Sequence, residues 1–148
     1  MREKIVTYYP EELINSAEFD ALIREYAKCN AMPNTDAIKN FDLKQYLAWG
    51  QNCVIGVLYN DDKMVGFSAV LKEVHLHTNS VVSVMDSLFV LPAYRNHNNG
   101  ESLINWAKTV SRDFEAAVML VTAPAGSRLE KVYTRKYTRL ESWFTVEI

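Results

Sequence analysis

The sequence lacks the features that mark several broad classes of protein. No apolar run comes near the roughly 18 residues that a membrane-spanning helix requires. The opening, Met1-Arg2-Glu3-Lys4, is not followed by the apolar core of a secretory leader. The formal net charge is only −2, whereas a nucleic-acid-binding domain needs a basic face. We therefore expect a cytoplasmic protein that binds neither a membrane nor nucleic acid.

Glycine, proline and cysteine are also scarce. With five glycines and four prolines among 148 residues, the chain has no low-complexity linker, and we expect one domain over residues 1–148. The two cysteines, Cys29 and Cys53, could pair or bind a metal, but their apolar surroundings favour buried, reduced thiols. His75 and His77 would share one strand face without a third ligand, so we expect no metal.

What the sequence does contain is a regular succession of apolar segments. Segments rich in β-branched residues predict strands, and apolar residues at helical spacing predict helices. The order β-α-α-β-β-β-α-β-α-β predicts an α/β (α+β) fold, with a mixed central sheet flanked by helices on both faces. The predicted strands span 4–8, 53–59, 64–71, 81–90, 117–122 and 140–148, and the predicted helices span 10–29, 36–49, 100–115 and 126–136.

The most informative segment runs from Asp86 to Gly100. An apolar strand ends at Pro92, a loop rich in asparagine follows, and an amphipathic helix begins at Gly100. The free backbone N–H groups at such a helix start form a ready anion site, and Arg95 adds a charged donor fork suited to phosphate. Asn98 tolerates the positive φ that such a loop requires. On its own, the loop could equally well serve only to cap the helix.

The spacing of this segment resembles the acyl-CoA-binding segment of the GNAT superfamily of N-acyltransferases. Asn98 occupies the place of the first glycine in the family pattern. Weaker echoes of the family lie at 64–67 and at 136–141, where Lys136 replaces a usual glycine. The resemblance covers nearly the whole chain and implies the GNAT fold. The residues in register with the pattern are Leu88, Phe89, Val90, Pro92, Tyr94, Arg95 and Gly100.

The resemblance implies acetyl-CoA as the acyl donor, with no metal. Backbone N–H groups of Phe89 and Val90 would hold the thioester carbonyl. Glu101, in the first helical turn, would compete with a bound phosphate. The basic residues Arg128, Lys131, Arg135, Lys136 and Arg139 form either a solvated face or a contact for the phosphorylated adenosine end. The cofactor-binding residues so implied are Leu88, Phe89, Val90, Arg95, Asn96, His97, Asn98, Asn99, Gly100 and Glu101.

Two side chains are candidates for the proton transfers of such a reaction. Asp86 lies where many family members carry a glutamate base, although it could instead bind a cationic amine or bond the neighbouring backbone. Tyr133 resembles the family tyrosine that protonates the leaving thiolate. The same predicted helix also offers Tyr137 as an alternative, and the lost glycine leaves the alignment open by one position. Ser83 and Ser87 are expected on the opposite strand face from Asp86, as packing residues.

The resemblance therefore implies an N-acetyltransferase that moves an acetyl group from acetyl-CoA to a primary amine of a small molecule or protein. The alternative is a catalytically inactive GNAT-fold module that acts by binding acyl-CoA or another protein. The first two helices would form the acceptor side, and the aromatic tail Trp143-Phe144 suggests an edge at which two copies could form a homodimer. The expected acceptor lining is Tyr8, Phe41, Tyr46 and Trp49.

Overall fold

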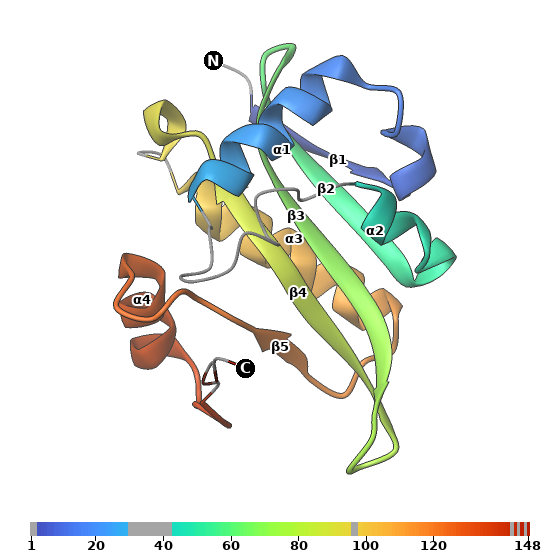
Figure 1. Ribbon diagram of the computed structural model, residues 1–148, viewed down its shortest axis with the longest axis vertical. Helices are drawn as coiled ribbons and strands as arrows, with labels where there is room; N and C mark the ends of the chain where they lie inside the picture. The colour runs from blue at the N-terminus through green and yellow to red at the C-terminus, as the bar shows by residue number, and fades with distance from the viewer. Residues whose placement is uncertain (1–2, 30–42, 96–97, 143, 145, 147) are drawn as a thin grey trace.

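The computed structural model describes residues 3–29, 43–95, 98–142, 144, 146 and 148. Five strands form one mixed sheet in the order β1-β2-β3-β4-β5, antiparallel except for the last pair, β4 and β5 (Figure 1). The strands are β1 (Glu3–Tyr8), β2 (Cys53–Asn60), β3 (Lys63–His75), β4 (Ser80–Val90) and β5 (Met119–Val121). The helices are α1 (Ala17–Cys29), α2 (Lys44–Leu47), α3 (Asn99–Asp113) and α4 (Arg128–Lys136).

Helices cover both faces of the sheet, as the sequence predicts. On one face, Phe19, Leu22 and Ile23 of α1 and Tyr46 of α2 pack in the same core cluster as Phe67 of β3. On the other face, α3 packs against β2, β3 and β4, and α4 joins this second cluster. The central strands are therefore buried on both sides, which explains their continuous apolar sequences.

One glycine fixes how closely α3 approaches the sheet. A Cβ built on Gly56 in β2 would lie 2.6 Å from the ring of Trp106 in α3. The indole Nε1 of Trp106 donates a hydrogen bond to Thr7 Oγ1 in β1 at 3.0 Å. The ring therefore lies flat over β2, in space that only a glycine leaves open.

Two predictions near the N-terminus need correction. The first helix begins at Ala17 rather than Pro10, because Ser16 Oγ accepts a hydrogen bond from Phe19 N at 3.1 Å and starts a new helix there. Residues Pro10–Glu12 form a separate 3-10 turn. Of the helix predicted over 36–49, only Lys44–Leu47 is helical in the described part, and residues 36–42 lie outside it.

The strand predicted over 140–148 is absent from the described residues of that stretch, which are 140–142, 144, 146 and 148. Apolar alternation alone does not make a strand, because its backbone must also pair with a neighbour. In the described part of the chain, the adjacent edge strand β5 has three residues and pairs with β4 alone. Trp143, predicted at a dimer edge, lies outside the described residues, and Phe144 is 86% exposed.

Cysteine burial was predicted correctly at only one of two positions. Cys53 is buried at the start of β2, whereas Cys29 is exposed at the end of α1, and both are free thiols. Across the residues that the structure describes, no helix is long and apolar enough to cross a bilayer.

Candidate active site

A β-bulge interrupts β4 in the middle of the segment singled out by the sequence. Ala69 of β3 pairs with Ser87, but the next residue, Val70, pairs with Met85, so Asp86 is the extra residue of β4. A bulge shifts the alternation of a strand by one position. Before Asp86 and after it, odd-numbered residues of β4 therefore face opposite sides of the sheet, and their backbone N–H groups point to opposite neighbours.

Beyond the bulge, β4 separates from β5. The last pair between these strands is Met85 with Val121, and residues 86–90 of β4 continue beyond it. Leu91 N donates to Val65 O of β3 at 2.8 Å. Because backbone direction alternates along an antiparallel pair, Phe89 also points toward β3, whereas Leu88 and Val90 point toward the gap. The gap-facing N–H groups are thus those of Leu88 and Val90, which corrects the expected pair Phe89 and Val90.

Asp86 lies on the face covered by α1 and α2, at the expected acceptor side. Its Oδ2 accepts a hydrogen bond of 2.5 Å from the hydroxyl of Tyr46 in α2. The same hydroxyl lies 3.4 Å from Ser87 Oγ, so the bulge brings Ser87 to the face of Asp86 rather than to the opposite one. Ser83, before the bulge, faces α3 as expected and donates to Ser111 Oγ at 2.6 Å.

The groups around Asp86 are held in their uncharged forms. Burial, then the charge of Asp86, raises the pKa of Tyr26 from 10.0 to about 12. The same two causes raise the pKa of the Cys53 thiol from 9.0 to about 12 and that of Tyr46 well above 10.0. The exposed carboxylate of Asp86 thus lies amid phenols and a thiol that are neutral at neutral pH, an arrangement that suits a cation.

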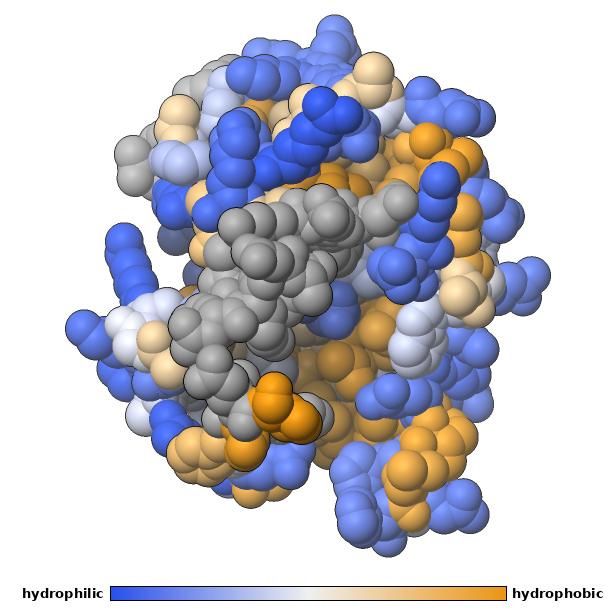
Figure 2. Space-filling view, viewed as in Figure 1, coloured by the Kyte–Doolittle hydropathy of each residue, from blue (hydrophilic) through white to orange (hydrophobic). Residues whose placement is uncertain are grey.

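The other expected lining residues are partly placed on this side. Tyr8 and Trp49 are partly buried and pack against the same core cluster as Tyr46. Phe41 lies outside the described residues. In the view of Figure 2, apolar side chains appear in the recessed centre of the molecule, so this face offers apolar surface as well as charge.

The loop before α3 has the predicted left-handed residue. Asn98 is the N-cap of α3 with φ of +58°, and its side chain makes no capping hydrogen bond. Asn99 and Gly100 are already helical, and the φ of Gly100 is not positive, so Asn98 is the left-handed residue of the loop. A Cβ built on Gly100 would meet no other atom within 4 Å, so the space over this residue is open. Asn96 and His97 lie outside the described residues.

Two polar side chains flank this helix start. Asn99 is 1% exposed, and its Nδ2 donates to Tyr94 O at 2.7 Å. Its Oδ1 is buried and has no hydrogen-bond partner among the described residues. Arg95 donates from Nε to Val90 O at 2.8 Å, and its guanidinium lies 5.7 Å from the centre of the Phe89 ring. Since Nε is committed to the strand, only the outer Nη groups of Arg95 can reach an anion.

Tyr133 lies in α4 with its hydroxyl buried. The side chain is 8% exposed and belongs to the cluster that contains Met85 and that Leu88 packs against. Within the described part of the chain, its hydroxyl has no hydrogen-bond partner. Burial, and to a lesser degree Tyr137, whose ring centroid lies 5.6 Å away, raises the pKa of Tyr133 above its usual 10.0. The phenol is therefore neutral and able to donate a proton.

Glu101 and Lys136, both singled out in the sequence, lie side by side. Glu101 is in the first turn of α3, and Lys136 is the last residue of α4. The Lys136 Nζ and Glu101 Oε1 atoms are 3.8 Å apart. The carboxylate expected to oppose a phosphate thus has a cation beside it.

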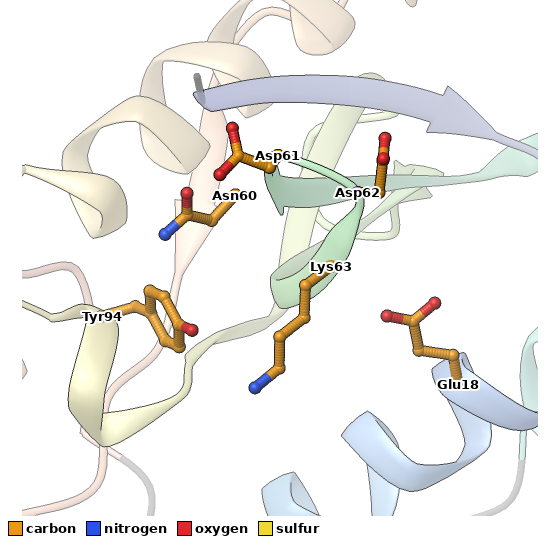
Figure 3. A pocket seen from close by; sticks show the side chains of 6 residues that line it. All are labelled: Glu18, Asn60, Asp61, Asp62, Lys63 and Tyr94. Atoms are coloured by element: carbon orange, nitrogen blue, oxygen red, sulfur yellow. The ribbon is translucent and has the colours of Figure 1, made fainter. Parts of the chain in front are cut away.

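A hollow of about 580 Å³ lies elsewhere, at the β2–β3 turn (Figure 3). It carries the carboxylates of Glu18, Asp61 and Asp62, whereas Lys63 Nζ lies 5.4 Å from the centre of the Tyr94 ring. An excess of acidic groups does not suit an anionic cofactor, and none of the predicted site residues lines this hollow.

No three His, Cys, Asp or Glu side chains in the described ranges are grouped so that they could hold a metal ion. The rings of His75 and His77 are 5.6 Å apart at the β3–β4 hairpin, and Thr78 Oγ1 lies 3.4 Å from His75 Nδ1.

The strand gap, the left-handed loop and α3 coincide with a known family pattern. Residues 19–137 match the model of the acetyltransferase (GNAT) family. The chain belongs to the GNAT family. No curated protein matches the chain significantly in sequence.

Solved GNAT structures share the fold across their whole length. A ribosomal-protein-alanine N-acetyltransferase from Brucella melitensis biovar Abortus 2308 is 16% identical, with a TM-score of 0.73 over 99% of both chains. An aminoglycoside acetyltransferase from an uncultured soil metagenomic sample is 15% identical, with a TM-score of 0.74 over 100% of this chain and 99% of that one. AAC(6')-Iy, in complex with the bisubstrate analogue CoA-S-monomethyl-acetylneamine, is also 15% identical, with a TM-score of 0.74 over 100% of this chain and 99% of that one.

Proposed function

We propose that this GNAT protein is an N-acetyltransferase that moves an acetyl group from acetyl-CoA to a primary amine. The observation that carries the proposal is the opening of the sheet after Asp86. It leaves the N–H groups of Leu88 and Val90 pointing into a gap, with the neutral phenol of Tyr133 in the cluster beside it. Backbone donors and a proton donor next to each other are what cleavage of a thioester requires.

The residues at the start of α3 fit an acyl-CoA. The space over Gly100 is open, and the N-cap Asn98 has φ of +58°. The N–H groups of the first turn and the Nη groups of Arg95 would hold the pyrophosphate. When bound, acetyl-CoA supplies an acetyl group activated as a thioester. Its thioester carbonyl would lie against the N–H groups of Leu88 and Val90.

Asp86 would bind the acceptor and take its proton. An alkyl amine has a pKa near 10.4, so it arrives as an ammonium ion and must lose a proton before it can attack. The charge of Asp86, fixed by the hydroxyl of Tyr46, attracts that ammonium ion, and the carboxylate accepts the proton directly or through water. The amine nitrogen then forms a bond to the carbonyl carbon while the carbon–sulfur bond breaks. Tyr133 would give its proton to the departing sulfur, and the second proton that the nitrogen loses on forming the amide would return to the Tyr133 oxygen, directly or through water.

The acceptor class follows from this charge. A primary amine on a small molecule or on a protein would suit an exposed carboxylate with phenol rings beside it. Two of the structural neighbours are described as aminoglycoside and ribosomal-protein-alanine acetyltransferases, which supports both sources of amine.

Thiol release across a panel of amines tests the function. We expect free CoA to appear with at least one polyamine, aminoglycoside or peptide amine, and acetyl-CoA to raise the melting temperature by mass action. No shift with acetyl-CoA would refute the cofactor assignment. A clear shift with no thiol release from any amine would support the alternative, a GNAT-fold module that binds acyl-CoA without turnover.

A further inference from the structure

We propose that Lys136 favours acyl-CoA binding by holding the Glu101 carboxylate away from the cofactor phosphates at the start of α3. The proposal rests on the proposed function, since it concerns the same acyl-CoA site. It assigns a binding role to a lysine that stands where the family pattern has glycine.

Glu101 is the third residue of α3, so its carboxylate lies close to the N–H groups that would hold a pyrophosphate. A carboxylate there suits the helix dipole but repels a second anion at the same end. At about 4 Å, two unit charges still interact appreciably even in water. An uncompensated Glu101 would therefore weaken phosphate binding, and the family pattern alone does not explain how this chain avoids that penalty.

Lys136 supplies the compensating charge. Its Nζ lies 3.8 Å from Glu101 Oε1, and the two side chains are 52% and 56% exposed. The contact joins the last residue of α4 to the first turn of α3, two segments that are far apart in sequence. Nearby, the buried Asn99 Oδ1 is an acceptor without a partner among the described residues, so a ligand that met it would do so with a donor group rather than a phosphate oxygen.

The position of Lys136 on α4 also links it to Tyr133. Residues three apart lie on the same side of a helix, so the phenol and the ammonium share one side of α4. Lys136 therefore lies within one turn of the proposed proton donor, with its ammonium beside Glu101 of α3. Arg95, whose Nε donates to Val90 O, presents its Nη groups to the phosphates rather than to Glu101 in this proposal.

A double-mutant cycle tests the coupling. We would measure CoA affinity calorimetrically at low ionic strength for the wild type, Lys136→Gln, Glu101→Gln and the double variant. We expect Lys136→Gln to weaken CoA binding roughly 3- to 10-fold and Glu101→Gln to strengthen it. With Glu101 already replaced, Lys136→Gln should change the affinity by less than about 2-fold.

Lys28→Gln is the matched control, because Lys28 forms an exposed contact with Glu25 at 2.9 Å on α1. It should leave CoA affinity unchanged. Unchanged affinity in Lys136→Gln, or an equal loss with and without Glu101, would overturn the proposal while leaving acyl-CoA binding itself intact. Failure of the wild type to bind CoA would instead overturn both the proposed function and this inference.

Discussion

Replacing Tyr133 with phenylalanine should make the protein more stable and less active. The hydroxyl of Tyr133 is buried and has no partner within the described residues. A buried polar group without a hydrogen bond costs about 1–3 kcal/mol of folding free energy, and Tyr133→Phe removes it with little change in shape. For a chain of this size, that gain corresponds to a rise in melting temperature of roughly 2–12 °C.

The same change removes the proposed general acid. The rate of acetyl transfer, kcat, should fall by about 10²- to 10⁴-fold, while CoA affinity stays nearly constant because the ring remains. Burial raises the pKa of Tyr133 above 10.0, so the wild-type phenol keeps its proton throughout the neutral range. Loss of activity through ionisation of this group should therefore appear only in strongly alkaline solution.

Thermal unfolding without ligand and steady-state thiol release measure the two effects. Tyr137→Phe is the control, because Tyr137 is only partly buried and its hydroxyl is not among the unpartnered buried atoms of the described residues. It should change neither quantity strongly. If Tyr133→Phe lowers the melting temperature, the hydroxyl has a protein partner and the premise fails. A stabilised variant with an undiminished rate would exclude Tyr133 as the acid.

Three further results are expected. Gly100→Ala should stabilise α3 by about 0.5–1 kcal/mol in thermal unfolding, because the φ of Gly100 is not positive. The same change should weaken CoA binding in calorimetry, because the added methyl group fills the open space above this residue. Unchanged affinity would contradict the placement of the phosphates. Tyr46→Phe should lower kcat without altering CoA affinity, because Asp86 loses its 2.5 Å donor; an unchanged kcat would exclude a positioning role. The free energy of unfolding, measured by denaturant titration, should be constant below about pH 10 and fall as the pH rises toward 12. The reason is that an unfolded tyrosine ionises near pH 10, whereas Tyr26 in the folded protein keeps its proton until about pH 12. A flat profile would contradict the burial of Tyr26.

Most of the fold could be predicted from the sequence because its apolar segments are long and regular. The strands β2 and β4 and the helix α3 begin and end within two residues of the predicted bounds. Boundaries were missed where a single polar contact decides them, as at Ser16, whose hydroxyl caps α1. A short strand such as β5 carries too few residues for its pattern to fix its ends.

Only part of the candidate site could be predicted from the sequence. Asn98 was predicted to tolerate positive φ, and it does have φ of +58°. The ion pair between Glu101 and Lys136 could not be predicted, because nothing in the sequence places the end of α4 next to the start of α3. The contact of Tyr46 with Asp86 joins residues 40 positions apart, which is equally invisible to local pattern.

The bulge at Asp86 explains why strict alternation failed where function is concentrated. Counting by twos from Ser83 puts Ser87 on the α3 face and directs the Phe89 amide into the gap, and both statements are wrong by one residue. The extra residue instead brings Ser87 beside Tyr46 and turns Leu88 and Val90 toward the gap. The Val90 carbonyl, facing away from β3, is then available to accept from Arg95 Nε, which ties the loop before α3 to the strand. A single inserted residue thus sets Asp86, the gap-facing N–H groups and the proposed cofactor loop in register with one another.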